Sequence, residues 1–315
     1  MSGSVSSPVG GSVGAADEGG TPPAPRLPST PSTASRSPSP SGGGLRPYAA
    51  VFAGRLQLTL QYRAAALAGF ATQLWFGAIR VLIFVAFYAG GSAHAPMSLG
   101  NAITYTWLGQ AFLAFLPWSA DPEITEMVRS GAVAYERLRP VDTYAWWYAR
   151  AVAWSVARVL PRAALMVAFA GVAMPLVGLG RWGLAPPASL AAAALFAGSM
   201  LGLVALSAAV TLMINVILVA TMSDRGANAL AGAFVNVLSG MIIPLAFFPD
   251  AVRPWLRAQP FAGLADIPFS IYFGSITGWG AIGGIALQFG WAAVLAVLGR
   301  RWLGAVMTRL QVQGG

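Results

Sequence analysis

Few side chains in this sequence could act as nucleophiles, metal ligands or phosphate-binding groups. The 315 residues include no Cys, no Lys and a single His, His94, so all of the positive charge comes from Arg. Without Cys the chain has no disulfide, Cys-bound zinc or thiol nucleophile. Without Lys it has no P-loop, whose Lys contacts the β- and γ-phosphates of ATP. No nearby carboxylate orients His94, which we interpret as an ordinary loop residue.

Charged residues gather instead in one polar connector, residues 121–140. Its first half has the sequence signals of a short helix. Asp121 can cap the N-terminus, and Pro122 suits the first helical position. Arg129 falls in the last turn, and Gly131 follows where a left-handed residue ends a helix. The pattern therefore predicts a capped helix in a segment between two apolar runs.

The same helix is predicted to be amphipathic. Ile124, Met127 and Val128 recur at i, i+3 and i+4, which places them on one face. A capped, charged helix with one apolar face, carried by a membrane protein, is a candidate contact for a soluble partner.

The rest of the chain has the composition of a membrane protein. It is 57% hydrophobic and 9% charged, with a mean hydropathy of +0.66. We therefore expect an all-α, polytopic membrane protein. Six apolar runs are long enough to cross a bilayer, at about 64–88, 99–118, 155–179, 188–219, 228–248 and 282–303.

Three segments outside the six runs have distinct roles in this interpretation. Residues 1–46 are rich in Ser, Pro and Gly and are expected to be a disordered cytoplasmic tail, so the transmembrane domain takes up residues 47–315. Residues 47–63 alternate apolar and polar side chains at helical spacing, as in an interfacial helix. Residues 249–279 are apolar but broken by Pro, and we expect short or re-entrant helices at the outer surface.

The placement of Arg predicts the orientation. With the N-terminus inside, most Arg residues outside the runs are cytoplasmic, and only Arg181, Arg253 and Arg257 lie outside. This positive-inside bias puts both termini and the 121–140 connector in the cytoplasm.

A few polar residues lie within the apolar runs. They include Gln73, Arg80, Gln110 and Asn236, which are candidates for a substrate path or for hydrogen bonds between helices. Arg80 lies deep in the first run and has no acidic partner within any run. It could snorkel, bind backbone carbonyls, or act in a substrate path or gate.

Three segments together resemble bacterial ABC-2 type permeases, in particular their six-span branch. They are residues 55–66, the connector from Glu123 to Pro140 that ends in Arg-Leu-Arg-Pro, and residues 240–249 followed by 264–274. The similarity covers about residues 47–312.

The resemblance implies the transmembrane subunit of an ATP-driven exporter. Such subunits form homo- or heterodimers on two ATP-binding subunits, which bind ATP and Mg²⁺, so this chain is expected to be no enzyme and to hold no cofactor, and no nucleic acid is expected as a partner. The cytoplasmic connector is then the coupling helix, with the apolar face entering a groove of the ATPase. The coupling residues would be Glu123, Ile124, Glu126, Met127, Val128, Arg129, Gly131, Glu136, Arg137 and Arg139. The apolar spans favour a hydrophobic, lipid-like or drug-like cargo moved across the cell membrane.

Two other functions are possible for a polytopic membrane protein. An ATP-independent carrier or channel usually has acidic residues in its spans for ion coupling, and none is present here. A membrane-embedded enzyme needs acid, base or metal groups at depth. The candidate pairs, Asp121 with Glu123 and Asp250 with Asp266, are expected at interfaces and have no His or Cys beside them.

Overall fold

The computed structural model describes residues 46–309 except 62, 92–94 and 139–140, and every regular element in these ranges is a helix. His94, Arg139 and residues 1–45 of the expected tail lie outside the described residues. Four helical stretches are long and apolar enough to cross a membrane, namely Ala66–Ala89, Thr143–Leu176, Leu190–Thr221 and Gly278–Arg309. The chain is therefore an all-α, polytopic membrane protein, as its composition predicts.

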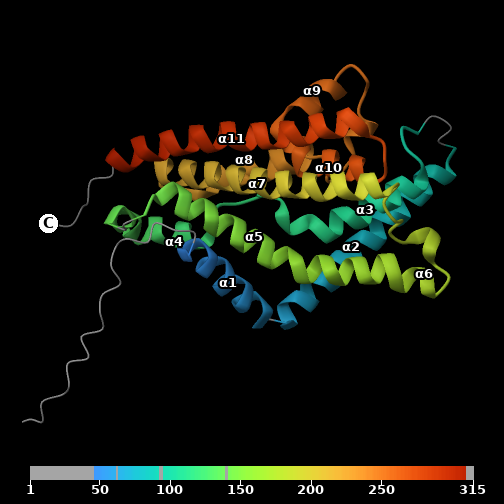
Figure 1. Cartoon of the computed structure of the whole chain (residues 1–315), viewed down its shortest axis with the longest axis horizontal. Coiled ribbons are helices and arrows are strands. Elements are labelled where there is room, and N and C mark those ends of the chain that lie inside the picture. Colours follow the sequence, from blue (N-terminus) through green and yellow to red (C-terminus); the bar gives the residue numbers. More distant parts are fainter. Residues whose placement is uncertain (1–45, 62, 92–94, 139–140, 310–315) are drawn as a thin grey trace, which may run out of the picture. The chain divides into compact units, whose positions relative to one another are not determined.

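The described helices follow one another along the chain as shown in Figure 1. The α-helices are α1 (Arg46–Gln61), α2 (Arg63–Ala89), α3 (Leu99–Phe112), α4 (Pro122–Arg129), α5 (Thr143–Val167), α6 (Met174–Leu176), α7 (Leu190–Thr221), α8 (Asp224–Leu238), α9 (Arg253–Ala258), α10 (Asp266–Tyr272) and α11 (Gly278–Arg309). Short 3₁₀ turns lie between them at η1 (Leu113–Phe115), η2 (Ala132–Leu138), η4 (Gly180–Trp182), η5 (Leu245–Phe247) and η6 (Pro260–Leu264), and a π-helical segment, η3 (Ala168–Ala173), joins α5 to α6.

Two of the six apolar runs form helices that are shorter than predicted. α3 has 14 residues and α8 has 15, against the roughly 20 that a full crossing requires. Beyond α3 the chain tightens into η1 and then extends at Leu116, before Pro117. α8 ends at Leu238, ten residues before the predicted end of its run at residue 248. Hydropathy alone therefore overestimated the helical part of these two runs.

α7 is the central helix of the packed core. It lies between α11 and α5 in Figure 1, and 72% of its most apolar window is buried inside the protein. Leu203, Leu206 and Leu212 are fully buried on it. A helix that is apolar on all sides is expected in a core or a bilayer, and α7 is mostly in the core.

α7 and α11 approach closely because α7 carries small residues where they meet. A Cβ atom on Gly202 would lie 2.9 Å from Oε1 of Gln288. The Gln288 side chain is fully buried; it accepts a hydrogen bond from Ser199 Oγ (2.8 Å) and donates one to the carbonyl oxygen of Gly263 (2.7 Å). Polar contacts of this kind hold helices together where lipid supplies no hydrophobic driving force.

After α8 the backbone leaves helical geometry at Gly240, whose φ is +81°. Its carbonyl oxygen accepts a hydrogen bond from Tyr105 Oη at 2.9 Å. The next carbonyl, that of Met241, accepts one from Arg80 Nη1, also at 2.9 Å. Non-helical backbone at membrane depth is tolerated only where protein or water satisfies it. Arg80 therefore binds a backbone carbonyl, the structural role considered for it above.

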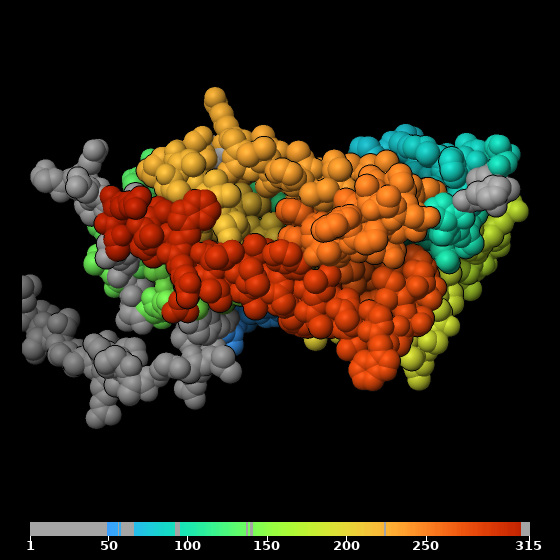
Figure 2. Space-filling model, turned by 90° about the horizontal axis from the view of Figure 1, so that it is seen from above, coloured from blue at the N-terminus to red at the C-terminus, as the bar shows by residue number. Residues whose placement is uncertain are grey.

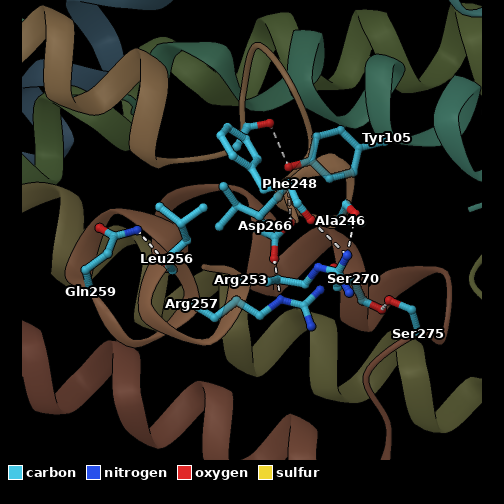
Figure 3. A network of polar contacts seen from close by, with 12 residues as sticks. Tyr105, Ala246, Phe248, Arg253, Leu256, Arg257, Gln259, Asp266, Ser270 and Ser275 are labelled. Atoms are coloured by element: carbon cyan, nitrogen blue, oxygen red, sulfur yellow. Dashed lines mark hydrogen bonds and ion pairs between the residues drawn. The ribbon is translucent and has the colours of Figure 1, made fainter. Parts of the chain in front are cut away.

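Asp266 holds the other side of this break (Figure 3). Its carboxylate accepts hydrogen bonds from the backbone N–H of Leu245 at 3.1 Å and from Arg257 Nε at 3.2 Å. The side chain is only 1% exposed, so Asp266 is buried inside the protein. A buried carboxylate with these donors stabilises the fold of residues 239–266. The region holds short helices, as predicted for residues 249–279.

The surface carries an apolar groove of about 460 Å³ between α7 and α8. It is lined mainly by Val210, Ile214, Ile217, Leu230, Phe234 and Phe261. On the face seen in Figure 2 the surface is hollowed between α8, in gold, and α11, in red. A cavity of this size and composition suits an apolar ligand.

Candidate functional site

The first half of the 121–140 connector forms the predicted helix, α4. The Asp121 carboxylate accepts a hydrogen bond from the Glu123 N–H at 2.8 Å, and Pro122 occupies the first turn. Gly131 follows the helix with φ +75°, the left-handed conformation that ends it. The capping prediction is confirmed at both ends, because caps depend only on residues close in the sequence.

The apolar face of α4 packs against the rest of this chain. Ile124 and Val128 are 1% and 4% exposed, and Met127 packs against the same buried cluster. Burial therefore corrects the prediction that Ile124 and Val128 enter a groove of an ATPase, whereas Met127 is only partly buried. An eight-residue helix is not stable alone, and its apolar stripe docks on the nearest apolar surface, which α7 provides.

The N-terminal end of α4 is held by ion pairs with two other helices. Arg150 of α5 contacts Glu123 at 2.5 Å and Asp121 at 3.5 Å. Arg55 of α1 forms a second ion pair with Glu123. The Arg150 and Asp121 side chains are only 8% and 10% exposed, so this pair is less screened by solvent than a surface pair. We call Arg55, Asp121, Glu123 and Arg150 the α4 clamp.

Two asparagines hold the backbone just before α4. The N–H of Ala120 donates to Asn228 Oδ1 of α8 at 2.9 Å, and the N–H of Asp121 donates to Asn215 Oδ1 of α7 at 2.8 Å. Asn215 is fully buried. Together with the α4 clamp, these bonds connect α4 to α1, α5, α7 and α8, so α4 cannot shift without acting on all four.

The second half of the connector turns one predicted contact residue inward. Glu136, in η2, is 4% exposed, and its Oε2 accepts a hydrogen bond from Trp147 Nε1 of α5 at 3.1 Å. The prediction that Glu136 contacts a partner at the rim is therefore wrong. The side chain of Arg137 and all of Arg139 lie outside the part of the chain that the structure describes.

What α4 and η2 present to solvent is a mixed surface. Glu126 and Arg129 are exposed on α4, and Tyr135 and Leu138 of η2 are 62% and 78% exposed. We call these four residues the connector surface. Two charges beside two exposed large apolar side chains, one aromatic and one aliphatic, form a surface suited to a protein partner.

The four candidate path residues are placed in different surroundings. Gln73 lines a cavity between α2, α5 and α7. Gln110 is buried beside Gly77, where α3 meets α2, and Arg80 binds the Met241 carbonyl. Asn236 is half-buried on α8. The structure thus places only Gln73 on the cavity wall.

Sequence reasoning missed the residues that hold the connector in place. Arg150 lies three residues after Trp147 on the same side of α5, but no local pattern indicates that it pairs with Glu123. Asn215 lies 94 residues from the backbone it binds, and no local pattern signals that pairing. In the described residues, no cluster of three His, Cys, Asp or Glu side chains could hold a metal ion.

Comparison with known proteins identifies the family of this chain. A sequence model of the family described as ABC-2 family transporter protein matches residues 74–314. No curated protein and no solved structure matches the chain. The matched range includes the whole connector and three of the four residues of the α4 clamp, Asp121, Glu123 and Arg150.

Proposed function

The chain belongs to the ABC-2 family of transporter proteins, and from this premise we propose that it is the membrane-spanning subunit of an exporter driven by a separate ATP-binding subunit. ATP and Mg²⁺ bind to that partner, and the chain contributes no catalytic group. Two membrane-spanning subunits, identical or different, sit on two ATP-binding subunits in the cell membrane.

This proposal rests on one observation: ion pairs and hydrogen bonds attach the exposed connector surface to the long helices. The connector surface faces solvent, while the α4 clamp ties the helix beneath it to α1 and α5. A partner that moves α4 therefore moves α5 through Arg150 and α7 through Asn215. This arrangement supports a role for α4 in coupling.

The coupling is mechanical in this proposal. ATP binding closes the partner pair, the connector surface follows, and the spans open toward the outside. Energy passes between the subunits only if the connector surface contacts the two partner states with different affinity.

The apolar groove between α7 and α8 supports a hydrophobic or lipid-like cargo. It has room for about 460 Å³ of ligand, within the range of small-molecule sites, and its lining offers few polar groups. A sugar chain would leave its hydroxyl groups unpaired against such a wall.

Charge reversal on the connector surface tests the coupling assignment. We expect Glu126→Arg and Arg129→Glu each to lower the amount of ATP-binding subunit that co-purifies with the tagged chain by roughly fivefold or more, because rim charges set the association of protein partners. ATP-driven efflux from proteoliposomes should fall in parallel, while membrane insertion is unchanged.

Arg181→Glu is the matched control, because Arg181 is exposed in the turn between α6 and α7, away from the connector. It should co-purify and transport as the wild type does. Full efflux from vesicles that contain no ATP-binding subunit would instead identify an ATP-independent carrier and contradict the proposal.

A further inference from the structure

A small cavity lies between α2, α5 and α7, next to the segment that follows α3. It has a volume of about 130 Å³, and its polar lining includes Gln73, Ser155, Arg158, Arg162, Ser207 and Thr211. Among the described residues, no Asp or Glu lines it. We call it the basic cavity. It is separate from the connector surface, and the coupling role described above makes no use of its two arginines.

Arg158 is held in a fixed orientation on the cavity wall. Its Nη2 donates to the carbonyl oxygen of Ala114 at 3.1 Å, and its guanidinium lies 3.5 Å from the ring centroid of Trp154. A cation over an aromatic face at this distance is attracted to it. The buried Nε of Arg158 has no hydrogen-bond partner among the described residues. Of the five N–H donors of the Arg158 guanidinium, one is paired with Ala114, so donors remain for a ligand.

Arg162 lies one helical turn further along α5 and reaches across to α2. A Cβ atom on Gly69 would come within 2.7 Å of Arg162 Nε, so the absence of a side chain at residue 69 makes room for the guanidinium. In the described part of the chain Arg162 forms no ion pair. A second cation four residues from Arg158 on the same helix is repelled by it.

Asp121, which does not line the cavity, is a carboxylate that attracts Arg158 electrostatically. It lies 3.5 Å from Arg150, to which it is already committed in the α4 clamp. Two neighbouring guanidinium groups thus share a cavity that supplies no anion of its own. An anionic ligand would relieve their repulsion.

Gln73 adds an unused polar group to the same wall. Its side chain is only 5% exposed, and its Oε1 accepts no hydrogen bond from any described residue. Buried polar atoms are nearly always paired, so an unpaired one on a cavity wall indicates a bound water or a ligand donor. A hydroxyl group or a protonated acid next to an anionic centre would supply that donor.

Depth in the membrane narrows the ligand class. Gln73 is seven residues inside the candidate span that begins at Ala66, which is about 10 Å along the helix. This is about a third of the way through a hydrocarbon core of roughly 30 Å, so a charged ligand there would need an apolar part as well. A volume of about 130 Å³ holds one phosphate-sized group with some water, and not an oligosaccharide.

We propose that the basic cavity binds the phosphate group of an anionic, lipid-like amphiphile, through Arg158 and Arg162. As an assignment of cargo class this rests on the proposed export function, but binding itself can be measured without transport. Arginine suits this task because its guanidinium presents a planar set of donors that matches phosphate oxygens.

The test measures lipid binding to the full chain in phosphatidylcholine nanodiscs. Fluorescent phosphatidylglycerol and a fluorescent phosphatidylcholine with the same tail are titrated in turn. We expect R158Q and R162Q each to weaken phosphatidylglycerol binding by about tenfold, with phosphatidylcholine unaffected. The affinity of R162K for phosphatidylglycerol should stay within about threefold of the wild-type value, because the positive charge is kept. The small loss reflects the missing planar set of donors.

R301Q is the control for charge alone, since Arg301 is exposed near the end of α11. It should leave both affinities unchanged. Equal loss in R301Q, or unchanged binding in both R158Q and R162Q, would overturn the site. If R158Q does not fold, R162Q decides alone, because its side chain makes no hydrogen bond within the described residues.

Two further arms separate the possible sources and the two proposals. If inorganic phosphate at millimolar concentration displaces the fluorescent phosphatidylglycerol, the cavity binds the free anion. That result would overturn the lipid assignment. Retention of the ATP-binding subunit by R162Q confirms that the variant is intact. If wild-type chain prefers phosphatidylglycerol through both arginines but never binds an ATP-binding subunit, the proposed export function fails while the binding site stands.

Discussion

Two residues of α5 each contact one half of the connector. Trp147 donates its indole N–H to Glu136 in η2, and Arg150 pairs with Glu123 at the start of α4. They are three residues apart, so they lie on the same side of α5. One side of one helix thus holds both halves of the connector, which is why we expect movement of the connector to reach α5 first.

The substitution Arg150→Met tests whether Arg150 holds α4 in place. The substitution keeps an apolar stem of similar length and leaves the Asp121 carboxylate, which is 10% exposed, without its cation. We expect a loss of about 1–3 kcal/mol in stability, the usual effect of removing a charged hydrogen-bond partner, seen as a lower melting temperature in detergent. Arg301→Met removes an exposed charge and should leave that temperature unchanged. Equal melting temperatures for both variants would mean that Arg150 does not hold α4.

The non-helical break after α8 determines where that helix ends. The segment from Ser239 to Leu245 is too apolar to be distinguished from a span by hydropathy, yet it leaves helical geometry at Gly240. Side chains from α2, α3 and α10 satisfy its backbone, namely Arg80, Tyr105 and Asp266. This break shortens α8 and allows α10 to pack against α7.

Gly240→Ala should therefore destabilise the protein. Its φ of +81° disfavours a side chain, and a Cβ atom would lie 2.9 Å from Tyr105 Oη and 3.3 Å from Asp266 Cβ. Strain of this kind costs about 1–3 kcal/mol. Gly226→Ala on α8 is the matched control, because nothing lies within 4 Å of its Cβ position. Thermal unfolding of the two variants checks this; a stable Gly240→Ala protein would contradict the described backbone at the break.

At the scale of the whole molecule, ion pairs gather at the end that carries the connector. Arg55 of α1 pairs with Glu123, and Arg300 near the end of α11 pairs with Asp142 at 2.9 Å. The first and last described helices therefore both have residues beside the connector. The side of the membrane on which this end lies remains the positive-inside prediction.

A reporter fusion tests the orientation. Green fluorescent protein fused after Gly315 should fluoresce and alkaline phosphatase there should be inactive, because both termini are expected in the cytoplasm. Alkaline phosphatase inserted in the turn at Arg181 should be active, since that turn is expected outside. The reverse pattern would place the connector outside and would remove its proposed access to an ATP-binding subunit.

The sequence by itself determined the features that depend on neighbours along the chain. These are the membrane class, the Arg bias, and the capped helix from Asp121 to Gly131, whose bonds join residues a few positions apart. Only the tertiary structure decided which face of that helix stays exposed, because the surface that buries Ile124 is on α7, far along the chain. The same holds for the pairing of Arg80 with Met241, 161 residues apart, and for the meeting of Gln73 with Arg158 and Arg162. Burial and long-range pairing arise from packing between distant helices, and no local pattern encodes the position of the distant partner.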